Sequence, residues 1–153
     1  MIDTTKMLLT FLSASLEDLS DNGDQISFTS MHPKDIHGTS TARVNLYLYQ
    51  LVEDSFLENT DLRKKPETNL LPGLSYHYMI TIHGMEDESG DFVLLEKIRE
   101  LIFKNPHIES DNREIVLNVA IHNQTLESIT SLWQALQAPL RPGLNCIVRE
   151  RSR

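Results

Sequence analysis

Six histidines and one cysteine are the side chains of this 153-residue chain best suited to metal binding or nucleophilic chemistry. His77 and His83 fall on the same face of a predicted strand, but six strand residues span about 20 Å at ~3.3 Å per residue, so one ion cannot bind both. His32, Asp35 and His37 share a short loop and could offer three metal ligands. Histidines in polar loops usually face solvent, and we therefore expect no metal site and no cofactor.

Cys146 stands between Leu144 and Val148 at the alternating spacing of a strand. A reactive thiol needs an accessible, electropositive setting, so this position favours an inert core cysteine over a nucleophile. A lone cysteine cannot form an internal disulfide, which fits a reducing compartment.

A group of carboxylates could bind calcium: Glu86, Asp87, Glu88 and Asp91. The group lacks the spaced acids and the terminal glutamate of a twelve-residue calcium loop, so we expect a solvated turn. The chain also lacks the dinucleotide-binding, P-loop, nucleophile-elbow and His-Glu-x-x-His motifs. We therefore expect no catalytic residues and no enzymatic activity.

Two alternatives remain open on the residues alone. A small α/β ligand-binding or enzymatic domain would use the region of Thr81, His83 and Asn118, and it predicts a monomer or dimer, a deep pocket and a histidine of perturbed pKa. A dimeric regulatory domain would instead pack through sheet faces, where the tyrosine-bearing strands could extend a sheet across a two-fold axis.

Composition indicates an ordinary soluble protein. The chain has 14 Lys and Arg against 22 Asp and Glu, a net charge of −8, with 40% hydrophobic residues. Its length predicts one domain with a core that needs no disulfide or metal. It contains no apolar run long enough for a membrane span and no cleavable signal, so we expect cytoplasmic synthesis and assembly. So acidic a chain is a poor partner for nucleic acid or an anionic membrane.

Positive charge gathers at the C-terminal end, where residues 141–153 carry a net +3 and leave −11 on the rest. Arg149, Arg151 and Arg153 could form a basic tail, residues 149–153, that docks on an acidic protein surface. A solvated, frayed terminus is the simpler interpretation of such a tail.

Hydrophobic periodicity predicts three helices and five strands. Asp3, Asp91 and Thr125 are suitable N-caps, and Pro139 ends the last helix. The strand over residues 43–54 is apolar on both faces and should be covered on both sides. Trp133 has the spacing of a core residue, and packing between strands explains the four tyrosines. The predicted helices cover residues 3–19, 91–105 and 125–138, and the predicted strands cover residues 26–28, 43–54, 74–83, 114–121 and 144–148.

This order predicts a single α/β or α+β domain over residues 1–153, with a mixed sheet of about five strands flanked by about three helices. The alternation of the last five elements suggests βαβ crossovers. Residues 55–72 form a long charged stretch without a period, which in a compact domain is either functional or a surface insertion.

Several segments, taken in order, give the chain a family resemblance. They are Val44-Asn45-Leu46-Tyr47-Leu48-Tyr49, then Leu71-Pro72-Gly73-Leu74-Ser75-Tyr76-His77-Tyr78-Met79-Ile80-Thr81, the helix through residues 95–103, and Leu132-Trp133-Gln134-Ala135-Leu136 followed by Pro139-Leu140-Arg141-Pro142-Gly143-Leu144. Across residues 40–149 the chain resembles the tail-cap, or tail terminator, proteins of phage-tail-like contractile injection systems of the antifeeding-prophage and virulence-cassette type. It departs at Cys146, where the family usually has an aromatic residue, and over residues 26–42, which match loosely.

The resemblance implies a structural protein that closes the baseplate-distal end of a tube and sheath, as a ring of six copies of itself bound to tube and sheath subunits. The finished particle could be released or retained. We expect the contact loop to be residues 55–72, because an adaptor loop can order on docking. The expected interface residues are Phe56, Leu57, Leu62, Arg63, Lys64, Lys65, Arg149, Arg151 and Arg153.

Overall fold

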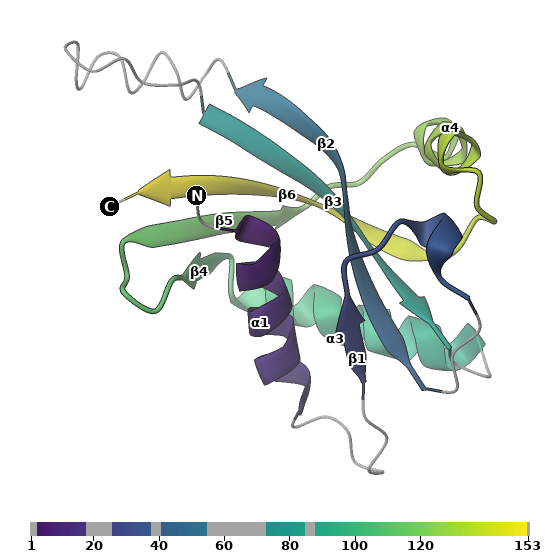
Figure 1. The fold of residues 1–153 in the computed structure, drawn as a ribbon, viewed down its shortest axis with the longest axis horizontal. Helices are drawn as coiled ribbons and strands as arrows, with labels where there is room; N and C mark the ends of the chain where they lie inside the picture. Colours follow the sequence, from purple (N-terminus) through teal and green to yellow (C-terminus); the bar gives the residue numbers. More distant parts are fainter. Residues whose placement is uncertain (1–2, 18–25, 38–40, 55–72, 85–87, 153) are drawn as a thin grey trace.

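The computed structural model describes residues 3–17, 26–37, 41–54, 73–84 and 88–152. Three α-helices, one short 3₁₀ helix and six strands make up these residues (Figure 1). In chain order they are α1 (Thr4–Leu16), β1 (Ser27–Thr29), η2 (Pro33–Asp35), β2 (Arg43–Asp54), β3 (Gly73–His83), α3 (Glu88–Lys104), β4 (His107–Glu109), β5 (Ile115–Ile121), α4 (Leu126–Leu136) and β6 (Gly143–Ser152). The predicted α+β class with about three helices is confirmed.

All six strands form one mixed sheet in the order β1-β2-β3-β6-β5-β4. The β1 and β2 strands are parallel, and every other neighbouring pair is antiparallel. The sixth strand is β4, which has only three residues and no periodicity to detect. The predicted βαβ crossovers are confirmed only in part. The strands β3 and β5, which precede and follow α3, run parallel with β6 between them, whereas β5 and β6, which α4 connects, are antiparallel neighbours.

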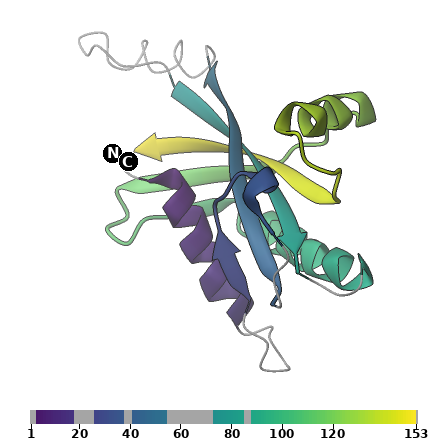
Figure 2. The ribbon, with the colours of Figure 1, turned by 45° about the vertical axis from the view of Figure 1, so that its right-hand side comes forward.

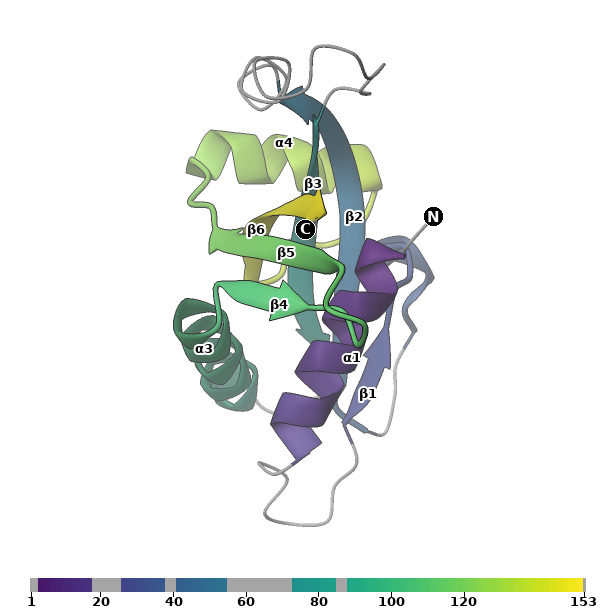
Figure 3. The same cartoon turned by 90° about the vertical axis from the view of Figure 1, so that its left-hand side faces the viewer.

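Helices cover the two sheet faces unequally, as the view from the side shows (Figure 3). The larger core lies under α1 and α3, where the predicted apolar stripes of both helices are buried against β2, β3, β5 and β6. Its helical members are Leu8, Leu12, Leu16, Leu94, Leu95, Ile98 and Ile102. The other face carries α4, which packs through Trp133 and Leu136 on Met79, and the short helix η2 beside it. Much of this second face has none of the described helices over it.

Side chains cap two of the three helices as predicted. The carboxylate of Asp3 accepts a hydrogen bond from the Lys6 backbone N–H, and the Thr125 hydroxyl accepts one from the N–H of Ser128. The Asp91 cap is wrong, because α3 begins three residues earlier at Glu88. A glycine inside a helix costs only about 1 kcal/mol, so Gly90 does not end the helix, and acidic residues in a first turn favour the helix dipole.

The helix α4 ends at Leu136, before Pro139, because Gln137 adopts a left-handed conformation with φ 55° and ψ 39°. The strand β6 then starts with a close approach to β3. A Cβ atom on Gly143 would lie 2.8 Å from the carbonyl oxygen of Ile80, so only glycine fits there without movement of the backbone.

The C-terminal arginines belong to β6 and not to a frayed tail. Arg149 pairs with Ser75 of β3 and Asn118 of β5, and Arg151 pairs with Val116. Between them, Glu150 points to the opposite face and accepts a hydrogen bond from the hydroxyl of Thr4 at 3.1 Å. The interpretation of residues 149–152 as a frayed tail is therefore wrong, since all four residues pair with β5 and Arg149 also pairs with β3. The two ends of the described chain lie side by side (Figure 2).

The strand β2 is only partly covered. Val44 and Leu46 are buried in the larger core, but Leu51 is 54% exposed. A register shift between Leu48 and Gln50 marks a bulge. The pairing of β3 with β6 ends at Ser75, so the last residues of β2 and the first of β3 extend beyond the other described strands as a two-stranded ribbon (Figures 1 and 2). The expectation that this strand is covered on both sides holds for its first half alone.

Candidate functional site

The three residues that the ligand-binding alternative would use do not meet. Thr81 and His83 lie at the end of β3, whereas Asn118 of β5 is level with Ser75, near the other end of that strand. Six residues separate Ser75 from Thr81, about 20 Å at ~3.3 Å per residue. Asn118 instead binds the ring of His107 at 2.6 Å. The region therefore contains two separate polar pairs.

The His83 side chain is 5% exposed, and its Nε2 lies 2.8 Å from the Thr81 hydroxyl oxygen. Burial, together with the smaller effects of the positive charges of Arg141 and Arg43, lowers the pKa of His83 to about 4. A charged imidazole would lose its hydration without gaining a carboxylate partner. His83 is therefore neutral at physiological pH.

This burial makes stability pH-dependent. The unfolded chain takes up the His83 proton near the ordinary pKa of 6.5, whereas the folded chain takes it up only near 4. The His83 contribution to the free energy of unfolding is therefore complete above about pH 6.5, decreases as the pH drops toward 4 and is constant below that. The total decrease is on the order of 2 kcal/mol. We expect urea unfolding to show this loss in the wild type and less of it in His83→Gln. His107→Gln, at an exposed position, should behave like the wild type, and an unchanged pH profile in His83→Gln would contradict the assignment.

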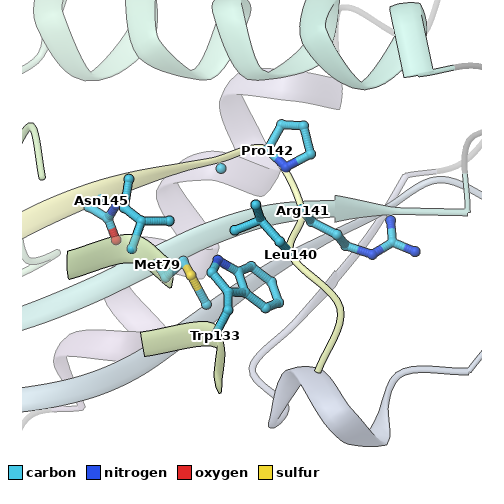
Figure 4. Close-up of a pocket in the computed structure, with 8 residues that line it drawn as sticks. Met79, Trp133, Leu140, Arg141, Pro142 and Asn145 are labelled. Atoms are coloured by element: carbon cyan, nitrogen blue, oxygen red, sulfur yellow. The ribbon is translucent and has the colours of Figure 1, made fainter. Parts of the chain in front are cut away.

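Two hollows lie beside α4, and Trp133 and Arg141 line both of them. The first has a volume of about 320 Å³ and is lined mainly by apolar side chains, including Met79, Ile129 and Leu140 (Figure 4). The second has a volume of about 270 Å³ and lies between α4, η2 and the end of β3. Its polar lining comes from Lys34, His37, His83, Gln137 and Arg141.

Hydrogen bonds within and between η2, α4 and β3 position the polar side chains of the second hollow. The 3₁₀ helix η2 begins at Pro33, and the His32 ring caps it by accepting a hydrogen bond from the Lys34 N–H at 3.1 Å. The Lys34 ammonium donates to the side-chain oxygen of Gln137 at 3.1 Å, which joins η2 to the end of α4. Arg141 donates to the carbonyl oxygen of Ile82 at 3.2 Å. The sequence-based search missed this cluster because its members are up to about one hundred residues apart.

Of the predicted interface residues, two lie in the described part of the chain. Arg149 and Arg151 alternate along β6 with the larger-core residues Cys146 and Val148, so they stand on the opposite sheet face, which carries α4. Phe56, Leu57, Leu62, Arg63, Lys64, Lys65 and Arg153 lie outside the described residues.

The other residues considered for chemistry, Cys146 and Trp133, lie in the hydrophobic core. Cys146 is buried between Tyr78 of β3 and Ile121 of β5, and burial raises the pKa of its thiol to about 12. Trp133 is a core residue as predicted, and Tyr47 and Tyr49 pack against its cluster. Among the described residues, no three His, Cys, Asp or Glu side chains gather closely enough to hold a metal ion. None of the helices in the described ranges is long and apolar enough to cross a membrane.

The fold and its surfaces define a small α+β module whose distinctive features are a partly uncovered sheet and a two-part hollow beside one helix. The sequence model of the Pvc16 N-terminal domain matches residues 3–150. The chain belongs to the Pvc16 N-terminal domain family. No curated protein matches it by sequence.

Two solved structures have a similar fold over the whole of this chain. One is the sheath/tube terminator of PVC, an extracellular contractile injection system, in its extended state, with a TM-score of 0.59 and 17% identity. The other is the tube-terminating cap of the anti-feeding prophage, with a TM-score of 0.65 and 15% identity. This chain covers 58% and 55% of those chains, so it spans little more than half of their length.

Proposed function

We propose that this chain is a structural cap that ends the tube and sheath of a phage-tail-like contractile injection particle and has no enzymatic activity. The observation that carries the proposal is the family match over residues 3–150. It is supported by the likeness of the whole chain to two terminators of such particles. The ligand-binding alternative gains less support, because Thr81 and His83 lie far from Asn118.

The cap acts as a ring of six copies, assembled with the particle in the cytoplasm before any release. A stack of rings has no intrinsic end, so a terminator must bind the last ring through one face and offer no equivalent face beyond it. Strand edges suit contacts between copies, and β1 covers only residues 43–45 of β2. From Leu46 onward the outer edge of β2 has no strand partner among the described residues.

Contacts to tube and sheath subunits use residues 55–72 and the uncovered sheet face. Residues 55–72 connect the end of β2 with the start of β3, where none of the described helices covers the strands. Their Phe56, Leu57 and Leu62 can supply apolar contacts, and Arg63, Lys64 and Lys65 can supply charge. Arg149 and Arg151 add positive charge on the sheet face, and Arg153 adds more after β6.

Deletion of the gene in the source organism tests the cap function. We expect electron micrographs of the particles to show overlong, variable or unsheathed tubes with open ends, because nothing then stops polymerisation. The intact gene should restore a narrow length distribution, and an empty vector should not. A gene in which a short Gly/Ser linker replaces residues 55–72 should fail to restore it. Normal capped particles after deletion would refute the cap function, and full rescue by the linker version would refute the loop assignment alone.

A further inference from the structure

The two hollows beside α4 form one surface feature, which we call the α4 groove. Trp133 and Arg141 line both halves and so stand at the boundary between them. Figure 4 shows the first half, with Trp133 and Met79 near each other and the Arg141 side chain directed away from Asn145. Each half is large enough for one or two side chains of a bound peptide.

The first half of the groove is apolar. Met79, Ile129 and Trp133 line it, and Leu140 beside it is 57% exposed. An exposed leucine next to a hollow lined by apolar side chains offers area that an incoming side chain would remove from water. This half suits one aliphatic or aromatic side chain.

The second half of the groove is basic. Lys34 and Arg141 line it, and Arg43 lies close enough to His83 to lower the pKa of that imidazole. None of these three cations forms an ion pair with a carboxylate in the part of the chain that the structure describes. Asp35, next to Lys34, is exposed and forms no ion pair with it. Cations that gather without a carboxylate partner among the described residues, in a chain of net charge −8, favour the binding of an anion.

We propose that the α4 groove binds a peptide segment of another protein of the particle, in which an apolar side chain stands one or two residues from a carboxylate. The apolar side chain enters between Trp133 and Leu140, and the carboxylate accepts hydrogen bonds from Arg141 and Lys34. Arginine and carboxylate match in geometry, and such charge-assisted bonds are among the strongest in proteins. A free phosphate would leave the apolar half unfilled. This inference rests on the proposed function for its choice of partner.

Fluorescence of Trp133, the one tryptophan in the chain, can report binding directly. The probe is a blocked pentapeptide with one phenylalanine followed by two glutamates, and the matched peptide has glutamines in place of the glutamates. We expect the acidic peptide to bind at least about tenfold more tightly at low salt, and less tightly as salt is added. Inorganic phosphate should leave the fluorescence unchanged.

Substitutions then locate the site. Lys34→Gln removes an exposed cation and should weaken binding about threefold to tenfold, whereas the matched control Lys104→Gln, on α3 across the sheet, should change it less than about twofold. Arg141→Gln should weaken it at least about tenfold. Arg141 also donates a hydrogen bond to the carbonyl oxygen of Ile82, so Arg141→Gln could fail to fold. In that case the comparison of Lys34→Gln with Lys104→Gln still tests the proposal.

Four outcomes would overturn the proposal. The first three are equal affinity for the two peptides, a fluorescence response to inorganic phosphate without peptide, and loss of peptide binding in both Lys34→Gln and Lys104→Gln. The fourth is self-association of the chain that Lys34→Gln abolishes, because a second copy would then be the occupant. A fifth would be binding that appears only after Glu86→Gln and Asp87→Asn, since these acidic residues of the chain itself would then be the occupant. Tube lengths after gene deletion are measured separately, so failure here is distinct from failure of the cap function.

Discussion

Replacing Trp133 with alanine should release helix α4 from the sheet while the rest of the protein stays folded. Trp133 is 4% exposed, and it and Leu136 are the two residues of α4 that are buried. Truncating a buried tryptophan costs about 3–5 kcal/mol. An isolated helix of eleven residues is marginal in water, so α4 has little stability without that contact. The larger core contains no α4 residue and should survive.

Hydrogen exchange followed by NMR or mass spectrometry measures this effect segment by segment. In Trp133→Ala we expect the amides of α4 to exchange at least about a hundredfold faster, and those of β3 and β6 less than about tenfold faster. Leu126→Ala, at a 75% exposed position of the same helix, should change exchange by less than about threefold. Equal acceleration throughout the sheet would show that α4 and the larger core unfold as one unit.

The helices α1 and α4 both have apolar periodicity, but their apolar residues are buried to different extents. In α1 the apolar stripe of Leu8, Leu12 and Leu16 is buried throughout, and both the helix and its Asp3 cap were predictable. In α4 the same periodicity included Leu126, which is exposed. Periodicity marks the side of a helix that can be buried, but the length of sheet beneath it decides how much of that side is covered.

Pairing between distant strands explains the main errors. Residues 149–152 carry alternating charges that resemble a solvated tail, and they form a strand because they pair with residues 115–118 of β5. The three-residue β4 exists only through its register with β5. The α4 groove depends on η2 and the end of α4 meeting through Lys34 and Gln137, which no local pattern encodes. The alternative that required a histidine of perturbed pKa was right about His83 and wrong about its partnership with Asn118.

Cys146 should be almost unreactive toward thiol reagents as long as the protein is folded. Its side chain is 1% exposed, in a strand that is paired on both sides. Burial raises the pKa of the thiol from 9.0 to about 12. The thiolate is the reactive form, so this shift alone lowers its population about a thousandfold at pH 8, and burial blocks the reagent as well.

Labelling with a chromogenic disulfide reagent measures this protection. We expect no reaction in native buffer on the timescale in which a free thiol reacts fully, and one equivalent after unfolding in urea. Ser128→Cys, at an exposed position of α4, should add one fast equivalent without exposing Cys146. Rapid native labelling of the wild type would mean that β6 separates readily from β3 or β5, and it would reopen the nucleophile hypothesis. Protection of Cys146 would instead show that β6 stays paired with β3 and β5 in the native protein. Copies in a ring could then contact one another through the surface of the domain without rearranging its core.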